Sequence, residues 1–590
     1  MNAITFPIDA REILAKKKKI KRQLLENSAD FIDKRIAILG GFTTSEIRNI
    51  LEIFLLNEGI RASFYESEYN HFYQDVMFDN PELIEFNPDI IYICTCNRNV
   101  THYPDLNDDS LEVLNNEYNR FEEVWEHIKE RYGCPVIQNN FEMPMYRLLG
   151  NRDCYDSHGR MYFIHELNGR LYKYAQNNDW LYVCDLNYIS ADYGLRLWQN
   201  PKQWYLYKYA LPMEGIPDLA YNVCRIIKAI YGKNKKGLAL DLDNTLWGGV
   251  VGDDGVEGIE IGNENAEAEA YLEFQDYLKQ IKELGVILTI DSKNDYENAI
   301  AGLNHPDSIL KSDDFIEIRA NWNNKDGNLR SIAESIGILP ESIVFVDDNP
   351  VERDIVSSNV NGVIAPDIGK VENYIQVIDR LGAFETTSIS DDDRKRNDMY
   401  GAEKRRKQDA EQYVDYESFL KSLDMKAEII PFSPLSYSRI SQLSNKSNQY
   451  NLTTRRYTKE EIEQIASDER YVTIQGRLGD KYGDNGIVSL IIGRFDDEKC
   501  HIDLWVMSCR VLKRNMEYAM MDTLAEECRR NNIKIIIGKY LPTKKNGMVK
   551  EHYSLFGFKK IHEEQAGNSV WELNLEDYKN MNNVIQVIRN

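Results

Sequence analysis

Two acidic residues stand directly behind a short apolar run in the middle of the chain. Within "LALDLDNTLWGGVVGDDG", residues 238–255, Asp241 and Asp243 follow a segment whose pattern predicts a buried strand. Carboxylates this close repel one another, and a carboxylate beside a core is costly unless something compensates for it. The stretch is therefore either a strand that runs into an acidic surface turn or part of a site for a cation and a phosphate.

Further segments of the same region could complete such a site. Ser292 follows the apolar run "VILTI", and Asp347 and Asp348 follow "SIVFV". Lys325 opens a predicted helix behind "NWNN". The carboxyl ends of parallel strands lie at one edge of a sheet, which is where such folds bind ligands. We therefore expect these side chains to converge.

Oxygen ligands of this kind suit Mg²⁺, which prefers carboxylates, waters and substrate phosphate. The predicted metal ligands are Asp241, Asp243, Asp347 and Asp348. Asp241 can also attack phosphorus to form an aspartyl-phosphate. Asp243 can protonate the leaving oxygen and later deprotonate water, which requires a raised pKa.

The remaining polar residues of the region are candidates for binding the substrate. Ser292 and Lys325 would hold the phosphoryl oxygens and offset their charge as part of the catalytic set. Thr245 and Asn294 are further substrate-binding candidates.

The order of these motifs resembles that of the haloacid dehalogenase (HAD) superfamily of phosphotransferases. The chain resembles the FkbH-like family, HAD subfamily IIIC, over nearly all of its length and most weakly before residue 180. The segments that carry this resemblance are "LDLDNTLWGGVVGDDG", "SKN", "FVDDNPVER", "QLSNKSNQYNLTTRRYT", "SCRVL" and "YLPTKKN". The sequence departs from the family at Asp291, where a small residue or cysteine is usual. Alternation along the strand directs this side chain away from Ser292.

A chain of 590 residues is too long for one core, and we expect four segments. Residues 1–225 alternate strands and helices and resemble an SGNH-type or flavodoxin-like α/β fold. Residues 233–385 form the HAD-type Rossmannoid domain with a parallel sheet, and residues 386–424 a charged, exposed connecting helix. Residues 425–590 read as α+β and resemble GNAT-type acyltransferases.

The SGNH-type resemblance lacks its nucleophile. Gly41 and Phe42 stand where an Asp-Ser pair is expected, and "DLNY" replaces the usual Asp-x-x-His. Without a serine and histidine there is no nucleophile–base pair. We expect an inert domain for docking or substrate binding, in which Asn97 and Asp185 cap the chain rather than catalyse.

The GNAT-type resemblance implies a loop that binds the pyrophosphate of a pantetheine cofactor. In the matching "SCRVLKRNMEYAMM", Lys513 and Asn515 occupy expected glycine positions, which argues against acetyl-CoA. Arg510, Lys513 and Arg514 either hold a phosphopantetheine arm or form a solvated helix start. Cys509 lies beside this predicted helix start, where the pKa of a thiol would fall, and is the candidate acyl acceptor; a buried, inert cysteine is the alternative.

Composition excludes several classes of function. The net charge of −24 offers no broad basic surface for nucleic acid. No apolar run approaches the roughly 20 residues that span a bilayer, so membrane insertion is not expected. Nine scattered cysteines and the lack of a secretory signal predict a reducing cytoplasm.

The FkbH-like resemblance implies transfer of a glyceryl group from 1,3-bisphosphoglycerate to an acyl carrier protein, with loss of phosphate. The partners would be a small phosphorylated substrate and the phosphopantetheine arm of the carrier, in polyketide, lipid or surface-polysaccharide synthesis. One alternative is a small-molecule or sugar phosphate phosphatase fused to a GNAT-type N-acetyltransferase, in polysaccharide or secondary-metabolite biosynthesis. A scaffold that only binds is the other.

Overall fold

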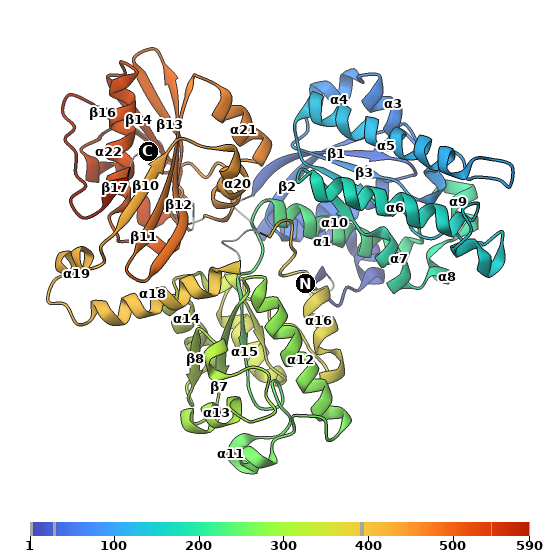
Figure 1. Cartoon of the computed structure of the whole chain (residues 1–590), viewed down its shortest axis with the longest axis horizontal. Helices are drawn as coiled ribbons and strands as arrows, with labels where there is room; N and C mark the ends of the chain where they lie inside the picture. Colours follow the sequence, from blue (N-terminus) through green and yellow to red (C-terminus); the bar gives the residue numbers. More distant parts are fainter. Residues whose placement is uncertain (1–3, 28–30, 390–393, 448, 544, 589–590) are drawn as a thin grey trace. The chain divides into compact units, whose positions relative to one another are not determined.

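The computed structural model describes residues 4–27, 31–389, 394–447, 449–543 and 545–588. The chain divides into two compact units, Met1–Ile230 and Tyr231–Asn590. The first unit contains one parallel sheet, and the second contains a parallel and a mixed sheet (Figure 1). The predicted fold class, α/β with parallel sheets, is confirmed. The finer division of the second unit at residues 386 and 425 stays a prediction.

The sheet of the first unit has the strand order β2-β1-β3-β4-β5, with every neighbouring pair parallel. Its strands are β1 (Ile32–Gly40), β2 (Ile60–Glu66), β3 (Ile90–Cys94), β4 (Val136–Asn139) and β5 (Leu181–Cys184). All five residues of the central β3, "IIYIC", are buried, as expected for a parallel strand covered on both faces.

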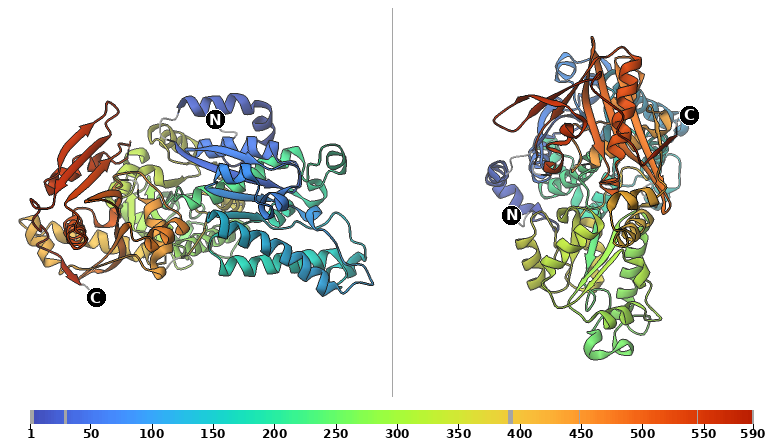
Figure 2. Two further views of the ribbon diagram at one scale, coloured as in Figure 1. Left: turned by 90° about the horizontal axis from the view of Figure 1, so that it is seen from above. Right: turned by 90° about the vertical axis from the view of Figure 1, so that its left-hand side faces the viewer.

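Helices cover both faces of this sheet (Figure 2). On one side three helices pack together, α1 (Ala10–Asn27), α2 (Ser45–Asn57) and α10 (Ile216–Ile230). On the other side two helices pack together, α5 (Ser110–Tyr132) and α6 (Arg160–Asn177). The shorter helices of the unit are α3 (Phe72–Met77), α4 (Pro81–Phe86), α7 (Leu186–Tyr193), α8 (Leu195–Trp198) and α9 (Pro201–Tyr207).

The second unit begins with a four-stranded parallel sheet of order β8-β7-β6-β9. Its strands are β6 (Gly237–Leu240), β7 (Ile287–Ser292), β8 (Glu317–Ala320) and β9 (Ile343–Val346). The helices around it are α11 (Val251–Asp254), α12 (Ala266–Glu283), α13 (Tyr296–Leu303), α14 (Lys325–Ile336), α15 (Pro350–Asn359) and α16 (Tyr374–Arg380). The central β6 lies between β7 and β9, so its carboxyl end faces the middle of the sheet edge.

The mixed sheet has eight strands in the order β15-β16-β14-β13-β12-β11-β10-β17. They are β10 (Lys426–Ile430), β11 (Tyr471–Asp480), β12 (Gly483–Asp496), β13 (Lys499–Met507), β14 (Ile535–Tyr540), β15 (Lys559–Glu563), β16 (Ser569–Asn574) and β17 (Gln586–Ile588). Its helices are α19 (Tyr416–Ser422), α20 (Tyr437–Lys446), α21 (Lys459–Ser467) and α22 (Met516–Arg530). The predicted helix and strands of this region therefore occur, within a sheet that pairs mostly antiparallel.

The expected connecting helix forms as α18 (Arg396–Ala410), but its exposure was predicted wrongly. Four of its residues are buried: Met399, Tyr400, Ala402 and Arg406. Arg406 donates through Nε to Asp480 Oδ2 of β11 at 2.7 Å. The buried face combines an ion pair with few apolar residues, so no apolar stripe is visible in the sequence.

Among the described residues, no helix has both the length and the hydrophobicity that crossing a membrane requires.

Candidate active site

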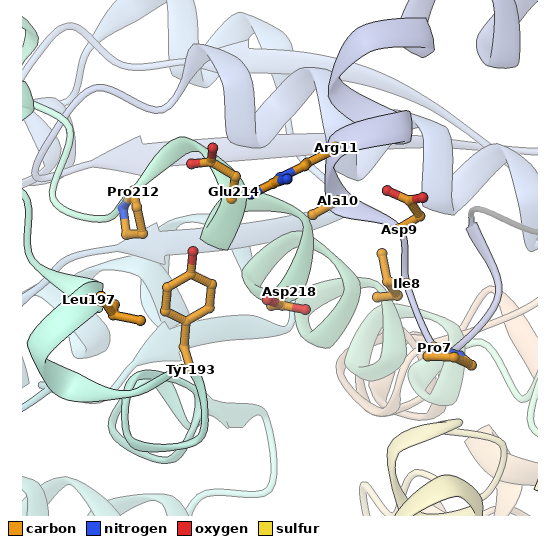
Figure 3. Close-up of a pocket in the computed structure, with 10 residues that line it drawn as sticks. All are labelled: Pro7, Ile8, Asp9, Ala10, Arg11, Tyr193, Leu197, Pro212, Glu214 and Asp218. Carbon is orange, nitrogen blue, oxygen red and sulfur yellow. The ribbon is translucent and has the colours of Figure 1, made fainter. Parts of the chain in front are cut away.

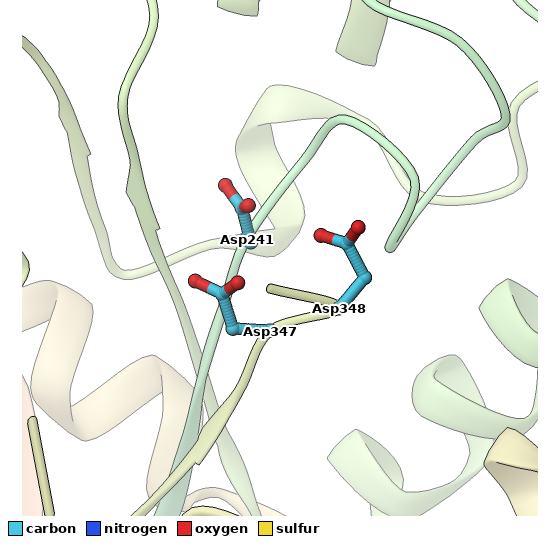
Figure 4. A group of neighbouring side chains, drawn as sticks. All are labelled: Asp241, Asp347 and Asp348. Carbon is cyan, nitrogen blue, oxygen red and sulfur yellow. The ribbon is translucent and has the colours of Figure 1, made fainter. Parts of the chain in front are cut away.

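Three carboxylates meet at the carboxyl edge of the four-stranded sheet. Asp241 directly follows β6, and Asp347 and Asp348 directly follow the neighbouring β9. One oxygen of each lies within 4.8 Å of the others, and the three side chains rise into the same space (Figure 4). The strand order thus brings together residues more than a hundred positions apart, as the sequence predicts for this edge.

Lys325 lies within hydrogen-bonding distance of two of these carboxylates. Its Nζ is 2.9 Å from Asp241 Oδ2 and 2.5 Å from Asp347 Oδ2. Burial alone would lower the pKa of Lys325, but the two carboxylates outweigh it and raise the pKa. Lys325 is the first residue of α14, where the helix dipole disfavours a cation. Its position is therefore explained by the carboxylates and not by the helix.

The cluster is electrostatically strained without a further cation. Burial raises the pKa of Asp347, and the charge of Asp241 raises it further, although Lys325 opposes the shift. The pKa of Asp348 is raised by the same two causes in the same order. Three carboxylates against one ammonium leave an excess of negative charge, and their oxygen atoms are the ligands that Mg²⁺ prefers. The residues present fit such an ion.

Asp243 is not a member of the group of three clustered carboxylates. Its Oδ1 accepts hydrogen bonds from Trp247 Nε1 at 2.9 Å and Val251 N at 3.1 Å, and its Oδ2 accepts from Asn294 Nδ2 at 3.0 Å. These three hydrogen bonds occupy both of its oxygens, and its role as a fourth metal ligand stays a prediction. Burial raises the pKa of Asp243, although the hydrogen bonds from Val251 and Trp247 lower it, and a raised pKa suits an acid–base group.

Trp247 was not predicted from the sequence, although it lies four residues after Asp243. The ring is fully buried and packs against Gly302 of α13, where an added Cβ would lie 2.9 Å from it. A glycine is therefore needed on α13 to admit the ring that orients Asp243.

Arg353 on α15 was also missed, although it ends the quoted motif "FVDDNPVER". Its Nη1 donates to the backbone oxygens of Asp347 and Asp348 at 2.9 and 2.7 Å. Its Nη2 donates to Asp367 Oδ1 at 2.7 Å. The guanidinium thus holds the backbone of the loop that follows β9. The sequence signal for this role was a basic residue one turn into the helix after the loop.

The predicted phosphate- and substrate-binding residues differ in how close they come to the carboxylates of the site. Ser292 ends β7 and is buried at the same sheet edge, and Asn294 reaches the site through Asp243. Thr245 is fully buried, and its hydroxyl has no hydrogen-bond partner. Direct contact of Thr245 with a substrate would therefore require the loop to move.

An exposed tryptophan lies at the rim of this edge. Trp322 follows β8 and keeps 71% of its surface exposed. Its indole N–H donates to Asp295 Oδ1 at 2.9 Å, and Asp295 adjoins the Asn294 that contacts Asp243. Its indole N–H is therefore bonded to the protein while most of the side chain stays in solvent.

The corresponding edge of the first unit is filled by amides. Asn99 donates to the backbone oxygen of Gly41 at 2.7 Å, and a Cβ at Gly41 would lie 2.4 Å from the Asn99 side chain. Gly41, which stands where the resemblance expects an aspartate, therefore has no room for a side chain unless Asn99 moves. Asn97 donates to Glu142 through both its backbone and its side chain, whereas Asp185 caps α7.

A hollow of 720 Å³ lies elsewhere in the first unit (Figure 3). Residues 7–11 line it together with Tyr193, Leu197, Pro212, Glu214 and Asp218. None of its lining residues is a predicted site residue.

The predicted basic trio lies in the connection between β13 and α22 and is mostly buried. Arg514 pairs with Glu403 of α18 and with Asp480, the latter at 3.1 Å, and Arg510 donates to Ser508 Oγ at 3.2 Å. Of the three, only Lys513 is exposed. Arg514 therefore makes ion pairs within the protein, and its predicted contact with a ligand stays a prediction.

The backbone and thiol of this loop also differ from simple expectation. Lys513 and Asn515 have φ of +66° and +63°, the left-handed region that glycine would favour. Cys509 is half-buried and begins the short turn η10 (Cys509–Val511), whereas α22 begins only at Met516. The thiol is thus not at the start of α22.

The FkbH N-terminal domain family matches residues 35–228. A solved structure of the N-terminal part of the protein BF1531 from Bacteroides fragilis, containing a phosphatase domain complexed with Mg, is 30% identical to this chain, with a TM-score of 0.59. The match covers 63% of this chain and 99% of that one. No curated protein sequence matches the chain.

Acetyltransferase structures match about a quarter of the chain. The ribosomal-protein-S18-alanine N-acetyltransferase from Escherichia coli is 10% identical over 25% of this chain and 94% of its own, with a TM-score of 0.20. Ard1 from Thermoplasma volcanium is 17% identical over 25% and 97%, with the same score. Because nearly the whole of the 30% identical structure is spanned and the FkbH domain matches the first unit, the chain belongs to the FkbH-like family of the HAD superfamily.

Proposed function

We propose that the protein is a HAD-type phosphatase that removes a phosphoryl group from a small phosphorylated substrate. The observation that carries the proposal is the group of three carboxylates, Asp241, Asp347 and Asp348, gathered at one sheet edge with Lys325 between two of them. Burial and a neighbouring carboxylate raise the pKa values of Asp347 and Asp348, and carboxyl groups perturbed in this way are typical of functional sites. The Mg-bound phosphatase-domain structure similar to this chain supports the same activity.

In the proposed reaction a carboxylate oxygen of Asp241 attacks phosphorus, and the bond from phosphorus to the leaving oxygen breaks. Asp243 gives its proton to that oxygen. It then takes a proton from the water that hydrolyses the aspartyl-phosphate, which releases phosphate. Lys325 and Ser292 hold the phosphoryl oxygens. Asp241, Asp347 and Asp348 would hold Mg²⁺, which when bound neutralises charge on the phosphoryl group.

We further propose that the substrate is an acyl phosphate such as 1,3-bisphosphoglycerate, and that the glyceryl group is loaded onto an acyl carrier protein. The FkbH-like family membership supports this choice. Attack on phosphorus leaves the free acid, which a thiol cannot capture. Loading therefore requires a thiolate to attack the acyl carbon of the intact acyl phosphate, which forms a thioester and breaks the carbon–oxygen bond, so that inorganic phosphate leaves. Cys509, half-buried and without a disulfide, is the proposed acceptor.

A phosphate-release screen tests the phosphatase proposal. Purified full-length protein is incubated with acyl phosphates and sugar phosphates, with Mg²⁺ or with a chelator. Release that needs Mg²⁺ is expected, and undiminished release in chelator would contradict the mechanism. Asp243→Asn should slow turnover by about 10²-fold while a first phosphorylation still occurs, since general acid–base catalysis contributes about that much. The matched control is Asp253→Asn, an exposed carboxylate of α11.

Intact-mass spectrometry with 1,3-bisphosphoglycerate and a phosphopantetheinylated carrier tests the acyl step. A glyceryl adduct on Cys509, and carrier loading lost in Cys509→Ala with phosphate release intact, are expected. Normal loading by the Cys509→Ala variant would show that the carrier thiol attacks the substrate directly. Cys154, the exposed cysteine of the first unit, provides the matched Cys154→Ala control.

A further inference from the structure

Asp291 is a fully buried carboxyl that the proposed chemistry does not use. It precedes Ser292 on β7 and has no exposed surface. Its Oδ1 accepts a hydrogen bond from Asn328 Nδ2 at 3.1 Å, whereas its buried Oδ2 has no partner. A buried polar atom without a partner costs free energy. The carboxyl group must therefore contribute something that an apolar side chain of the same shape would not.

The amide of Asn328 links three elements of the site. Its second hydrogen bond runs from Nδ2 to Asn321 Oδ1 at 3.1 Å, just after β8. That oxygen also accepts from the backbone of Asn323 at 2.9 Å, and the backbone N–H of Asn321 donates to Ser292 O at 3.1 Å. The two N–H groups of one side-chain amide thus join α14 to β7 and to the loop that follows β8.

Asn328 lies three residues after Lys325, so both side chains occupy the same face of α14. Both are buried, with exposures of 6% and 2%. Any shift of the first turn of α14 relative to β7 would therefore displace Lys325 Nζ from the carboxylates that it contacts.

We propose that Asp291 is a positioning residue: by accepting the hydrogen bond of Asn328 it holds the first turn of α14 so that Lys325 lies between Asp241 and Asp347. The inference deepens the proposed phosphatase function and rests on it for its kinetic consequence. Asp291 acts as a hydrogen-bond acceptor and not as a charge. Burial raises the pKa of Asp291 well above its ordinary value, although Lys325 and Asn328 oppose the shift, which agrees with a neutral acceptor.

Two substitutions of nearly equal shape separate these roles. Asp291→Asn keeps an acceptor oxygen for Asn328, whereas Asp291→Leu has none. Asn328→Ala removes the donor of the same hydrogen bond, on α14. It tests the link even if the Asp291→Leu variant does not fold. Thr289→Val is the control, because Thr289 lies two residues earlier on the same strand and its hydroxyl donates to Leu238 O instead of to α14.

The first readout is independent of activity. Brief amine acetylation of the full-length protein, followed by peptide mass spectrometry, measures how well Lys325 is protected. Lys325 should stay protected in wild type, Asp291→Asn and Thr289→Val, and become labelled in Asp291→Leu and Asn328→Ala. A variant that combines Asp291→Leu with Asn328→Ala should be labelled no faster than either single variant, since each substitution removes the same hydrogen bond.

The second readout is the kinetics of phosphate release. Asp291→Leu should lower kcat by about 10²-fold with KM nearly unchanged, because a small misplacement of a catalytic group has about that cost. Asp291→Asn should restore wild-type kcat. Failure of asparagine to restore kcat and protection, or full protection in the leucine and Asn328→Ala variants, would overturn the proposal. If wild type releases no phosphate, the phosphatase proposal fails while the labelling still decides whether Asp291 positions Lys325.

Discussion

Two parallel sheets of this protein carry polar side chains at their carboxyl edges, and the two sets behave differently. In the first unit, Asn97 donates twice to Glu142, and Asn99 donates to the backbone behind β1. In the second unit, Asp241 and Asp347 belong to a group whose negative charge a single lysine does not balance. One edge satisfies its own polar groups, and the other does not.

This difference in how the polar groups are satisfied distinguishes a structural hydrogen-bond network from a candidate ligand-binding site. Buried polar groups that satisfy one another stabilise one arrangement and leave nothing for a ligand. Like charges held together by the fold cost free energy, which is recovered when a cation or substrate binds. We therefore expect the edge of the first unit to contribute to stability and the edge of the four-stranded sheet to carry the proposed chemistry.

The largest expected effect comes from the proposed nucleophile of the charged edge, Asp241. Asp241→Asn removes the attacking carboxylate and a proposed metal ligand while keeping the size of the side chain. Phosphate release should fall by about 10³-fold or more, equal to about 4 kcal/mol of activation free energy. Steady-state assays with excess Mg²⁺ measure it, and the exposed Asp253→Asn variant should remain at the wild-type rate. A variant at position 241 with near-normal turnover would show that this edge is not the reaction centre.

The next effect concerns the stability of the first unit. Burial raises the pKa of Glu142 to about 7, although the hydrogen bonds from Asn97 lower it. A carboxyl whose folded pKa is raised binds more protons in the folded state, so stability falls as pH rises from about 4.5 through about 7. The loss should approach about 3 kcal/mol by pH 8.

Hydrogen exchange of the peptides around β4, corrected for the intrinsic pH dependence, measures this stability in the full-length protein. Glu142→Gln should remove most of the fall between pH 5 and pH 8 and leave phosphate release unchanged. A phosphate-release defect in the glutamine variant would instead give this edge a part in catalysis and break the contrast between the two sheets.

Much of the charged edge could be predicted from the sequence, because each residue directly follows a strand or opens a helix. Asp241, Ser292, Lys325 and Asp347 needed only the rule that parallel strands end at one edge. Lys325 carried an additional signal, since a cation at a helix N-terminus is unfavourable without a partner. The direction of Asp243 could not be predicted, because it depends on a tryptophan that only a glycine of another helix admits.

The mixed sheet was less predictable for a similar reason. The buried state of Arg510 and Arg514 depends on α18, whose buried face has no apolar periodicity. Ion pairs between distant segments, such as Arg514 with Glu403, leave no spacing signal in the sequence. Basic residues that look like a ligand site in the sequence can therefore be internal partners in the fold.

The smallest expected effect is at the rim of the charged edge, where Trp322 presents its ring to solvent. The ring is fixed through its N–H to Asp295, so contact with the organic part of a substrate requires little ordering of the protein. Such a contact is worth about 1 kcal/mol, and Trp322→Ala should raise KM by about fivefold with kcat unchanged. Inhibition by inorganic phosphate, which has no organic part, should stay at the wild-type value. The control is Phe78→Ala, since Phe78 is similarly exposed, at 74%, but belongs to the first unit. Two results would contradict this prediction: a constant KM for every substrate found in the screen, or a parallel weakening of inhibition by phosphate. In either case the ring does not select the organic group, and the specificity of the edge lies with its charged residues alone.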